Sequence, residues 1–190
     1  SLYNGRIILK LIESIAEASS LLKQGQILAY PTEAVYGLGC DPFNQSAVER
    51  LIALKQRDAG KGFILLIADW AQLISLVGTL SDEWIARVEK TWPGPVTWVF
   101  PKAPGLPDWL SGKYDGVAIR MSAHPIAHQL SVDGPVVSTS ANISGLPPVM
   151  DRTDLQLQFP KGIDAVFDGA LGGALKPTSI FDVCSGKQLR

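Results

Sequence analysis

The stretch that decides the fold is QILAYPTEAVYGLG, residues 26–39. Its first part, Gln26–Tyr30, is a mostly apolar run that predicts a buried strand, and Pro31 ends that strand. The segment Thr32–Gly39 follows directly. We expect it to be a turn in which Thr32 could hold a small polar ligand, with two glycines that let backbone approach closely. The alternative is a strand-to-helix turn in which Thr32 caps the helix.

On both sides of this stretch, short apolar runs alternate with helical patterns, which is typical of an α/β protein. Helices are predicted over residues 12–24 with a stop at Gly25, over 46–56 with Ser46 as cap, from Asp69 to Val77, from Ser81 to Trp92, and from Pro125 to Leu130. Further strands are predicted over Phe63–Ile67, Val96–Phe100, Val117–Arg120, Val136–Ser138, Ala165–Phe167 and Ser179–Val183. Because strands outnumber helices and some strands are consecutive, we expect a twisted mixed sheet with flanking helices.

The bulk composition limits the class of protein. A chain of 190 residues suits one domain, so we expect a single domain over residues 1–190. No apolar run approaches the roughly 20 residues that span a membrane, so no membrane partner is expected. The net charge of −1 does not indicate nucleic-acid binding. Cys40 and Cys184 lack a CxxC pattern and predict two free thiols in a reducing cytosol.

The first segment with candidate chemistry is Lys55-Gln56-Arg57. Two side chains two residues apart on an α-helix point about 200° apart, so these cations converge only if the helix ends at Lys55 and the chain then extends. A converged lysine and arginine suit a phosphate group. The alternative is that both cations offset the dipole at a helix C-terminus.

The second segment is STSANISG, residues 138–145, which follows the predicted strand around Val136. In open α/β sheets, ligands bind beyond the carboxyl ends of strands. Hydroxyls and an amide from Ser138, Ser140 and Asn142 could surround phosphate or ribose oxygens. The alternative is a turn whose small polar residues bond their own backbone. No GxxxxGK[ST] phosphate loop occurs in the chain.

Single residues carry weaker signals. Arg120 closes a predicted strand, where an arginine can clamp a carboxylate or form a structural ion pair. Thr178 alone indicates a cap or a turn. His124 and His128 are the only histidines, and a catalytic zinc would need a third protein ligand, so we predict no metal site. The five tryptophans are expected in the core or an interface, not as a platform for stacked bases.

Five motifs occur in a fixed order: PTEAVYGLG (31–39), KQR (55–57), WPGPVT (92–97), VAIRM (117–121) and STSANISG (138–145). In this order they resemble the YrdC/TsaC family, from about residue 12 to the C-terminus. The resemblance implies a YrdC/RibB-like α/β fold with a wide, open, positively lined cavity. It also implies a nucleotidyltransferase that makes threonylcarbamoyl-AMP and pyrophosphate from L-threonine, bicarbonate or CO2, and ATP.

The resemblance assigns roles by position. Nucleotide contact and catalysis fall to Lys55, Arg57, Ser140 and Asn142, with Arg190 also near the nucleotide. L-threonine contact falls to Thr32, Arg120, Ser138 and Thr178. Mg²⁺ would travel with ATP and not in a protein cage. Downstream proteins would transfer the threonylcarbamoyl group to an adenosine beside the anticodon, so tRNA or another RNA is a possible partner.

The chain departs from the longer family members in three places. It stops at Arg190 without their C-terminal extension, it has Leu66 about where they carry a histidine, and it has Pro177-Thr178-Ser179 where they often carry EST. All three fit a short form of the enzyme. An alternative function is an RNA-binding factor in ribosome maturation that uses the same basic cavity. Carbamoyl transfer, as in hydrogenase-maturation proteins, would need zinc-binding and acylphosphatase-like parts that this sequence lacks.

Overall fold

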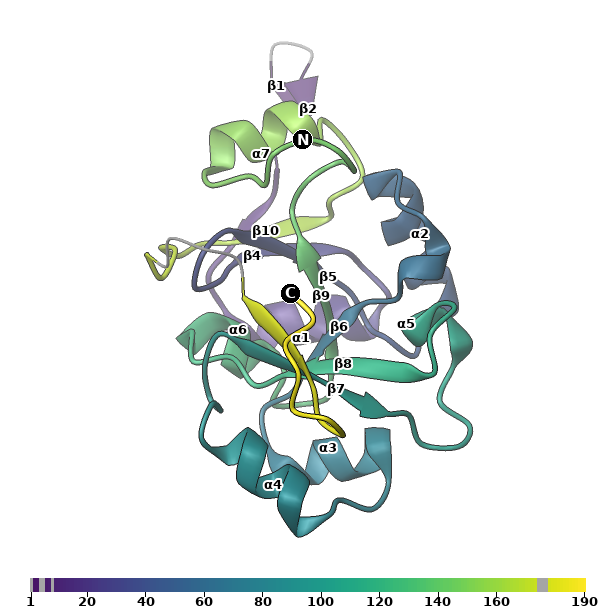
Figure 1. Cartoon of the computed structure of the whole chain (residues 1–190). Helices are drawn as coiled ribbons and strands as arrows, with labels where there is room; N and C mark the ends of the chain where they lie inside the picture. Colours follow the sequence, from purple (N-terminus) through teal and green to yellow (C-terminus); the bar gives the residue numbers. More distant parts are fainter. Residues whose placement is uncertain (1, 4–5, 8, 174–177) are drawn as a thin grey trace.

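A nine-stranded sheet forms the centre of the molecule (Figure 1). The computed structural model describes residues 2–3, 6–7, 9–173 and 178–190. The strand order is β11-β7-β8-β6-β9-β5-β4-β10-β3, and β1 and β2 form a separate antiparallel pair. Among the residues described, none of the helices combines the length and the hydrophobicity of a transmembrane span.

The strands are short, and most fall where they were predicted. They are β1 (Leu2–Tyr3), β2 (Arg6–Ile7), β3 (Leu11–Ile12), β4 (Leu28–Pro31), β5 (Tyr36–Gly39), β6 (Ile64–Leu66), β7 (Val96–Pro101), β8 (Gly116–Arg120), β9 (Val136–Ser140), β10 (Ala165–Phe167) and β11 (Ser179–Asp182). The sheet is mixed, as expected: β6 runs parallel to β8 and antiparallel to β9. The yellow β11 crosses in front of β7 and β8 in Figure 1 and pairs in parallel with β7.

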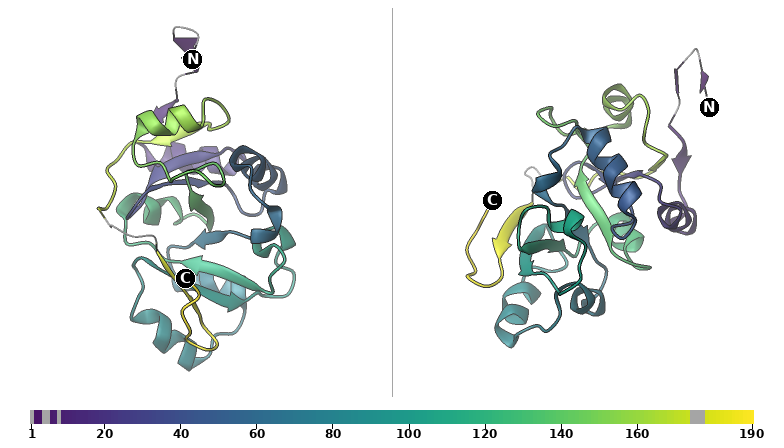
Figure 2. Two further views of the ribbon diagram at one scale, coloured as in Figure 1. Left: turned by 45° about the horizontal axis from the view of Figure 1, so that its top comes forward. Right: turned by 90° about the vertical axis from the view of Figure 1, so that its right-hand side faces the viewer.

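The helices flank this sheet, as the two further views show (Figure 2). They are α1 (Ile15–Lys23), α2 (Gln45–Lys55), α3 (Trp70–Val77), α4 (Asp82–Glu89), α5 (Asp108–Ser111), α6 (Pro125–Leu130) and α7 (Arg152–Gln158), with a 3-10 turn at Ala59–Lys61. The predicted caps at Asp69 and Ser81 are confirmed. Their side-chain oxygens accept from the backbone N–H of Gln72 at 2.9 Å and of Trp84 at 3.2 Å.

Strand β4 is buried on both faces and separates two apolar clusters. Ala29 packs in the larger cluster, whereas Leu28 and Tyr30 pack in a smaller cluster with residues of α1 and α6. Successive side chains of a strand point to opposite faces, so this alternation gives three layers. The predicted tryptophan positions agree with this core, because Trp92 and Trp98 are buried.

The two glycines of β5 make room for the ring of Tyr30. A Cβ atom at Gly37 would lie 2.8 Å from Cε2 of Tyr30, and a Cβ atom at Gly39 would lie 2.6 Å from the carbonyl oxygen of Val137. The expected close approach of backbone is therefore confirmed. It occurs inside the sheet, with Tyr30 directly opposite Gly37 in the antiparallel pairing.

The prediction that Thr32–Gly39 forms a turn is wrong in its second half. Tyr36–Gly39 is strand β5, which pairs with β4 on one side and β9 on the other. The reading of Thr32 as a helix cap is wrong as well, because the connection joins two strands. Glycine disfavours strands in general, but here the Tyr30 ring fills the space that missing side chains leave.

Two predicted helices begin at the wrong residue. Ile12 was expected in the first helix, but it lies in β3, pairs with Phe167 and is buried, and Ser14 caps α1 instead. The second helix is capped by Asn44 and not by Ser46, because the Asn44 side chain accepts from a backbone N–H at 3.0 Å. Helices α5 and α7 and strands β1 to β3 were not predicted.

Candidate functional site

One cavity of about 630 Å³ brings together residues from distant parts of the sequence. All nine predicted site residues line it: Thr32, Lys55, Arg57, Arg120, Ser138, Ser140, Asn142, Thr178 and Arg190. Lys61 adds a fifth cation, and no Asp or Glu lines the cavity within the part of the chain that the structure describes. The expected wide, positively lined cavity is therefore present.

The strand register explains why part of the sheet is open here. Gly37 lies opposite Ser140 in the pairing of β5 with β9, and Ile64 lies opposite Ser138 in the pairing of β6 with β9. Ser138 and Ser140 are two residues apart on one strand, so they share a face. Leu66 and Val136, next along these strands, belong to the cluster that α1 and α6 cover. The cavity therefore occupies the uncovered remainder of that face.

The end of α2 aims Lys55 and Arg57 into the same space. The helix ends at Lys55, one residue before the predicted end at 56 and as convergence of the two cations requires, and Gln56 then adopts a left-handed conformation with φ 51° and ψ 45°. The expectation that the chain extends after Lys55 is thus wrong at Gln56, which turns the chain instead. The backbone N–H of Arg57 bonds the carbonyl of Ile52 at 3.1 Å and closes this turn.

Lys55 ties the end of α2 to the loop that follows β9. Its ammonium donates to Oγ1 of Thr139 at 2.6 Å and to the carbonyl of Ser140 at 2.5 Å. Its own carbonyl accepts from the backbone N–H of Ser144 at 2.8 Å. A cation that only offset a helix dipole would stay in solvent, whereas Lys55 is 3% exposed.

The surroundings of Lys55 alter its protonation. Burial, followed by the charges of Arg57 and Lys61, lowers the pKa of Lys55 to about 7. A buried ammonium among other cations is costly to keep charged. An anionic ligand in the cavity would offset that cost, so this is a site prepared for negative charge.

Arg57 is held on two sides. One guanidinium nitrogen donates to the carbonyl of Gly62, and the guanidinium carbon lies 4.5 Å from the ring centroid of Phe63. Burial lowers the pKa of Arg57 from its usual value, although an arginine remains charged at neutral pH. These contacts fix the plane of a group that can present two donors to one phosphate.

Ser140 and Asn142 hold each other in the loop after β9. The Ser140 hydroxyl donates to Oδ1 of Asn142 at 2.5 Å. Nδ2 of Asn142 donates to the carbonyls of Ile143 and Leu146, each at 3.1 Å. The alternative hypothesis, a turn whose polar residues bond their own backbone, is therefore correct for Asn142. The same side chains nevertheless line the cavity.

Arg120 lines the cavity, where it could clamp a carboxylate, and it also forms a buried ion pair. The two hypotheses for this residue are therefore compatible. Its guanidinium pairs with one carboxylate oxygen of Glu33, while the hydroxyl of Ser122 donates to the other. The side chains of Arg120 and Glu33 are 5% and 14% exposed. Sequence reasoning missed Glu33 and Ser122. A signal was available, because each lies within two residues of a predicted site residue.

Thr178 and Arg190 complete the rim from the C-terminal segment. The Arg190 guanidinium donates to the carbonyl of Thr178 at 2.8 Å and to its hydroxyl at 3.3 Å. Burial lowers the pKa of Arg190 from its usual value. Pro177, which was named with Thr178 in the sequence comparison, lies outside the described residues.

His124 has structural partners. Nε2 of His124 bonds the carbonyl of Ala170 at 2.8 Å, and Nδ1 accepts from the backbone N–H of Ile126 at 3.2 Å, so the proton resides on Nε2. Across residues 2–3, 6–7, 9–173 and 178–190, no group of three His, Cys, Asp or Glu side chains could hold a metal ion. Cys40 is buried and Cys184 is exposed, and both are free thiols.

Comparison with known proteins identifies the family. The family model described as "Telomere recombination", which covers Sua5, YciO and YrdC, matches residues 20–190. The chain therefore belongs to the Sua5/YciO/YrdC family, and the resemblance found in its motifs is confirmed.

Two relatives match over nearly their whole length. A protein of Methylococcus capsulatus is 50% identical over 175 residues, which cover 91% of this chain and 94% of that protein. A protein of Coxiella burnetii is 46% identical over 180 residues, which cover 94% and 97%. Both are named threonylcarbamoyl-AMP synthase.

Solved structures agree with the fold. The crystal structure of P. abyssi Sua5 complexed with L-threonine has a TM-score of 0.84 and 32% identity and covers 93% of this chain. The chain spans about half the length of that protein, since the match covers 54% of it. E. coli YciO, at 23% identity and a TM-score of 0.77, supports the fold alone. The expected twisted mixed sheet with flanking helices is confirmed.

Proposed function

We propose that this protein is a threonylcarbamoyl-AMP synthase, a nucleotidyltransferase that joins L-threonine, bicarbonate and ATP. The observation that carries the proposal is the meeting of two loops at one cavity, one with Lys55 and Arg57 and the other with Ser140 and Asn142. The synthase relatives, which match over nearly their whole length, favour this activity over the RNA-binding alternative.

The reaction proceeds in two steps. The amine of L-threonine attacks the carbon of bicarbonate, and a carbamate forms with loss of water. A carbamate oxygen then attacks the α-phosphorus of ATP, the bond to the β-phosphate oxygen breaks, and pyrophosphate leaves. Neither step needs a covalent bond to the protein, so positioning and charge stabilisation can supply the rate.

The phosphates would lie against the two loops. Lys55 and Arg57 would balance the negative charge that grows on the leaving pyrophosphate. The hydroxyl of Ser140 and the amide of Asn142 would exchange their mutual bond for bonds to the α-phosphate and hold it in line with the attacking oxygen. Arg190 would contact the nucleotide from the opposite rim, and Mg²⁺ would enter with ATP as part of the substrate.

L-threonine would occupy the part of the cavity lined by Thr32, Arg120, Ser138 and Thr178. Arg120 keeps donor groups beyond those that bond Glu33, because a guanidinium has five. It would present those donors to the substrate carboxylate, while the hydroxyls would bond the amine and the side-chain hydroxyl.

The product would pass to proteins that transfer the threonylcarbamoyl group to an adenosine beside the anticodon of tRNA. We further propose that residues 1–190 form a single domain of this type. The family match over residues 20–190 supports that proposal.

The test is a reconstitution from purified components. The protein is incubated with ATP, bicarbonate and L-threonine, pyrophosphate release is measured, and the adenylate is identified by mass spectrometry. The adenylate should form only when all three substrates are present. Lys55→Ala should keep the fold, judged by circular dichroism, and lose the activity. Pyrophosphate release that does not need L-threonine, or full turnover by Lys55→Ala, would contradict the proposal.

A further inference from the structure

The residues that end the chain fold into a hairpin along one edge of the sheet. We name residues 179–190 the C-terminal hairpin; it consists of β11, a turn at 183–187 and a returning segment at 188–190. The returning segment pairs with β11, because the carbonyl of Ile180 accepts from the N–H of Leu189 at 2.6 Å and of Arg190 at 3.2 Å. One end of this hairpin is the turn, and the other end is the cavity rim.

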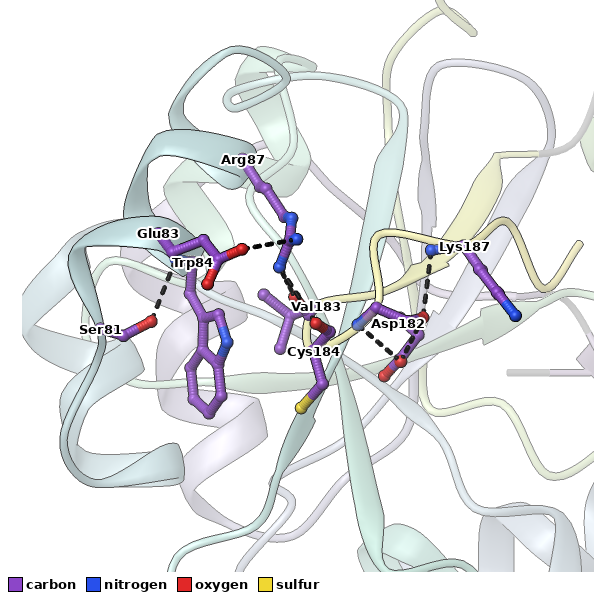
Figure 3. Close-up of polar contacts among 9 residues, drawn as sticks. Ser81, Glu83, Trp84, Arg87, Asp182, Val183, Cys184 and Lys187 are labelled. Atoms are coloured by element: carbon purple, nitrogen blue, oxygen red, sulfur yellow. Dashed lines mark hydrogen bonds and ion pairs between the residues drawn. The ribbon is translucent and has the colours of Figure 1, made fainter.

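Arg87 of α4 forms hydrogen bonds to the turn (Figure 3). Its Nη1 donates to the carbonyls of Val183 at 2.7 Å and Cys184 at 3.1 Å, and its Nη2 donates to Glu83 at 2.9 Å. The guanidinium lies directly against the turn, since a Cβ atom at Gly186 would be 3.3 Å from Nε of Arg87. Two carbonyls of the hairpin therefore depend on one side chain of a helix outside it.

The turn is also closed from within. The carboxylate of Asp182 accepts from the hydroxyl of Ser185 at 2.6 Å and from its backbone N–H at 3.0 Å. These bonds, the hydroxyl first, hold the pKa of Asp182 below its usual value. The turn is therefore stabilised by its own hydrogen bonds, and Arg87 fixes its position relative to α4.

The opposite end of the hairpin carries two cavity residues. Arg190 bonds Thr178 through its guanidinium, and both line the cavity. The four residues of β11 separate this end from the turn by about 13 Å at roughly 3.3 Å per residue. Packing holds the hairpin between these ends, because Val183 is buried and the ring of Phe181 lies 5.2 Å from that of Trp98.

Strand β11 is held by its pairing with β7, whereas the returning segment at 188–190 pairs with the outer side of β11, so the position of Arg190 depends on how the whole hairpin is anchored. We infer that Arg87 is a positioning residue, which fixes the turn of the C-terminal hairpin and thereby holds Arg190 and Thr178 at the cavity. This inference rests on the proposed function for the ligand that Arg190 meets. The ordering of the hairpin itself does not depend on that function.

The experiment compares ATP binding in Arg87 and Arg190 variants. If Arg190 is in place for only about a tenth of the time once the turn is released, the apparent affinity falls by the same factor. Arg87→Gln should therefore raise the KM for ATP about tenfold, with kcat changed much less. Arg87→Lys keeps the charge beside Glu83 but lacks the planar fork, so its KM should be intermediate.

A double-mutant cycle separates positioning from a general loss of stability. In an Arg190→Ala background, Arg87→Gln should change the KM for ATP less than twofold, because the residue through which it acts is gone. Arg50→Gln is the matched control. Arg50 also donates to a backbone carbonyl, of Gly25, but it does not line the cavity, and its KM should stay within twofold of the wild type.

Two readouts keep the inference separate from the proposed function. The dissociation constant for ATP is measured by calorimetry without L-threonine, and hydrogen exchange at the amides of Ile180 and Arg190 is measured in the empty protein. Failure of the wild type to form the adenylate would refute the proposed function only. An unchanged KM and unchanged exchange in Arg87→Gln, or the same tenfold effect in the Arg190→Ala background, would overturn the inference.

Discussion

Raising the pH from 7 to 9 should weaken ATP binding through a single side chain, Lys55. Its pKa of about 7 means that the empty protein loses this charge near neutrality. Roughly one molecule in ten keeps the proton at pH 8 and roughly one in a hundred at pH 9. If the bound phosphates keep Lys55 protonated, the association constant falls about fivefold from pH 7 to 8 and about tenfold, or about 1.4 kcal/mol, from pH 8 to 9.

The assay is isothermal titration of ATP at pH 8 in two buffers that differ in ionisation enthalpy. The wild type should take up nearly one proton for each ATP bound, since the ligand restores a charge that the empty site lacks. Lys55→Arg is the control, because an arginine keeps its proton throughout this range. That variant should show neither the uptake nor the slope of affinity with pH.

The same pKa has a consequence for stability. The pKa of Lys55 lies below its ordinary value of 10.5, so between about pH 7 and 10 the unfolded chain binds more protons than the folded one. The free energy of unfolding of the empty wild type should therefore rise with pH in this window, relative to that of Lys55→Met. An ATP affinity that does not change between pH 7 and 9, or a slope that Lys55→Arg shares, would refute the assignment of the proton to Lys55.

The remaining predictions concern three other residues. Glu33→Gln removes the charge that faces buried Arg120, so denaturant unfolding should show a loss of about 3 kcal/mol, and the KM for L-threonine should rise. An unchanged KM would mean that the ion pair does not set the position of Arg120. Asn142→Asp brings a carboxylate toward the phosphates and should lower kcat/KM for ATP at least a hundredfold, roughly the loss of one aligned donor. A smaller effect in steady-state kinetics would place the amide away from the α-phosphate. Gly37→Ala puts a methyl group 2.8 Å from the Tyr30 ring and should cost about 1–3 kcal/mol in thermal unfolding. A Tm equal to that of the wild type would mean that the Tyr30 ring shifts to accommodate the added methyl group without cost.

Some elements marked by a cap were predictable from the sequence, although the cap predicted at Ser46 was wrong, because Asn44 caps that helix. The helices after Asp69 and Ser81 begin where their caps predicted, and the helix that opens at Pro125 ends at Leu130. Failures occurred where tertiary contacts outweigh local pattern. Ile12 continues the apolar spacing of a helix, yet it pairs with Phe167, which lies 155 residues later (167 − 12) and outside any local sequence window.

The candidate site was predictable to the level of its lining residues but not of their partners. The order of the motifs named Lys55 and Asn142, and both line the cavity. The buried pair of Arg120 with Glu33 depends on how β8 lies relative to the turn after β4, which spacing along the chain does not give. The substrate contacts of these residues stay predictions.

The ammonium of Lys55 bonds the β9 loop at two points, and a bound phosphate would compete with the loop for it. Its ammonium secures the β9 loop in the empty protein, so a phosphate that draws this group toward itself must weaken that attachment. Occupancy and loop mobility are then thermodynamically linked. A variant in which the attachment of Lys55 to the β9 loop is stronger should have a higher Tm and a lower affinity for ATP.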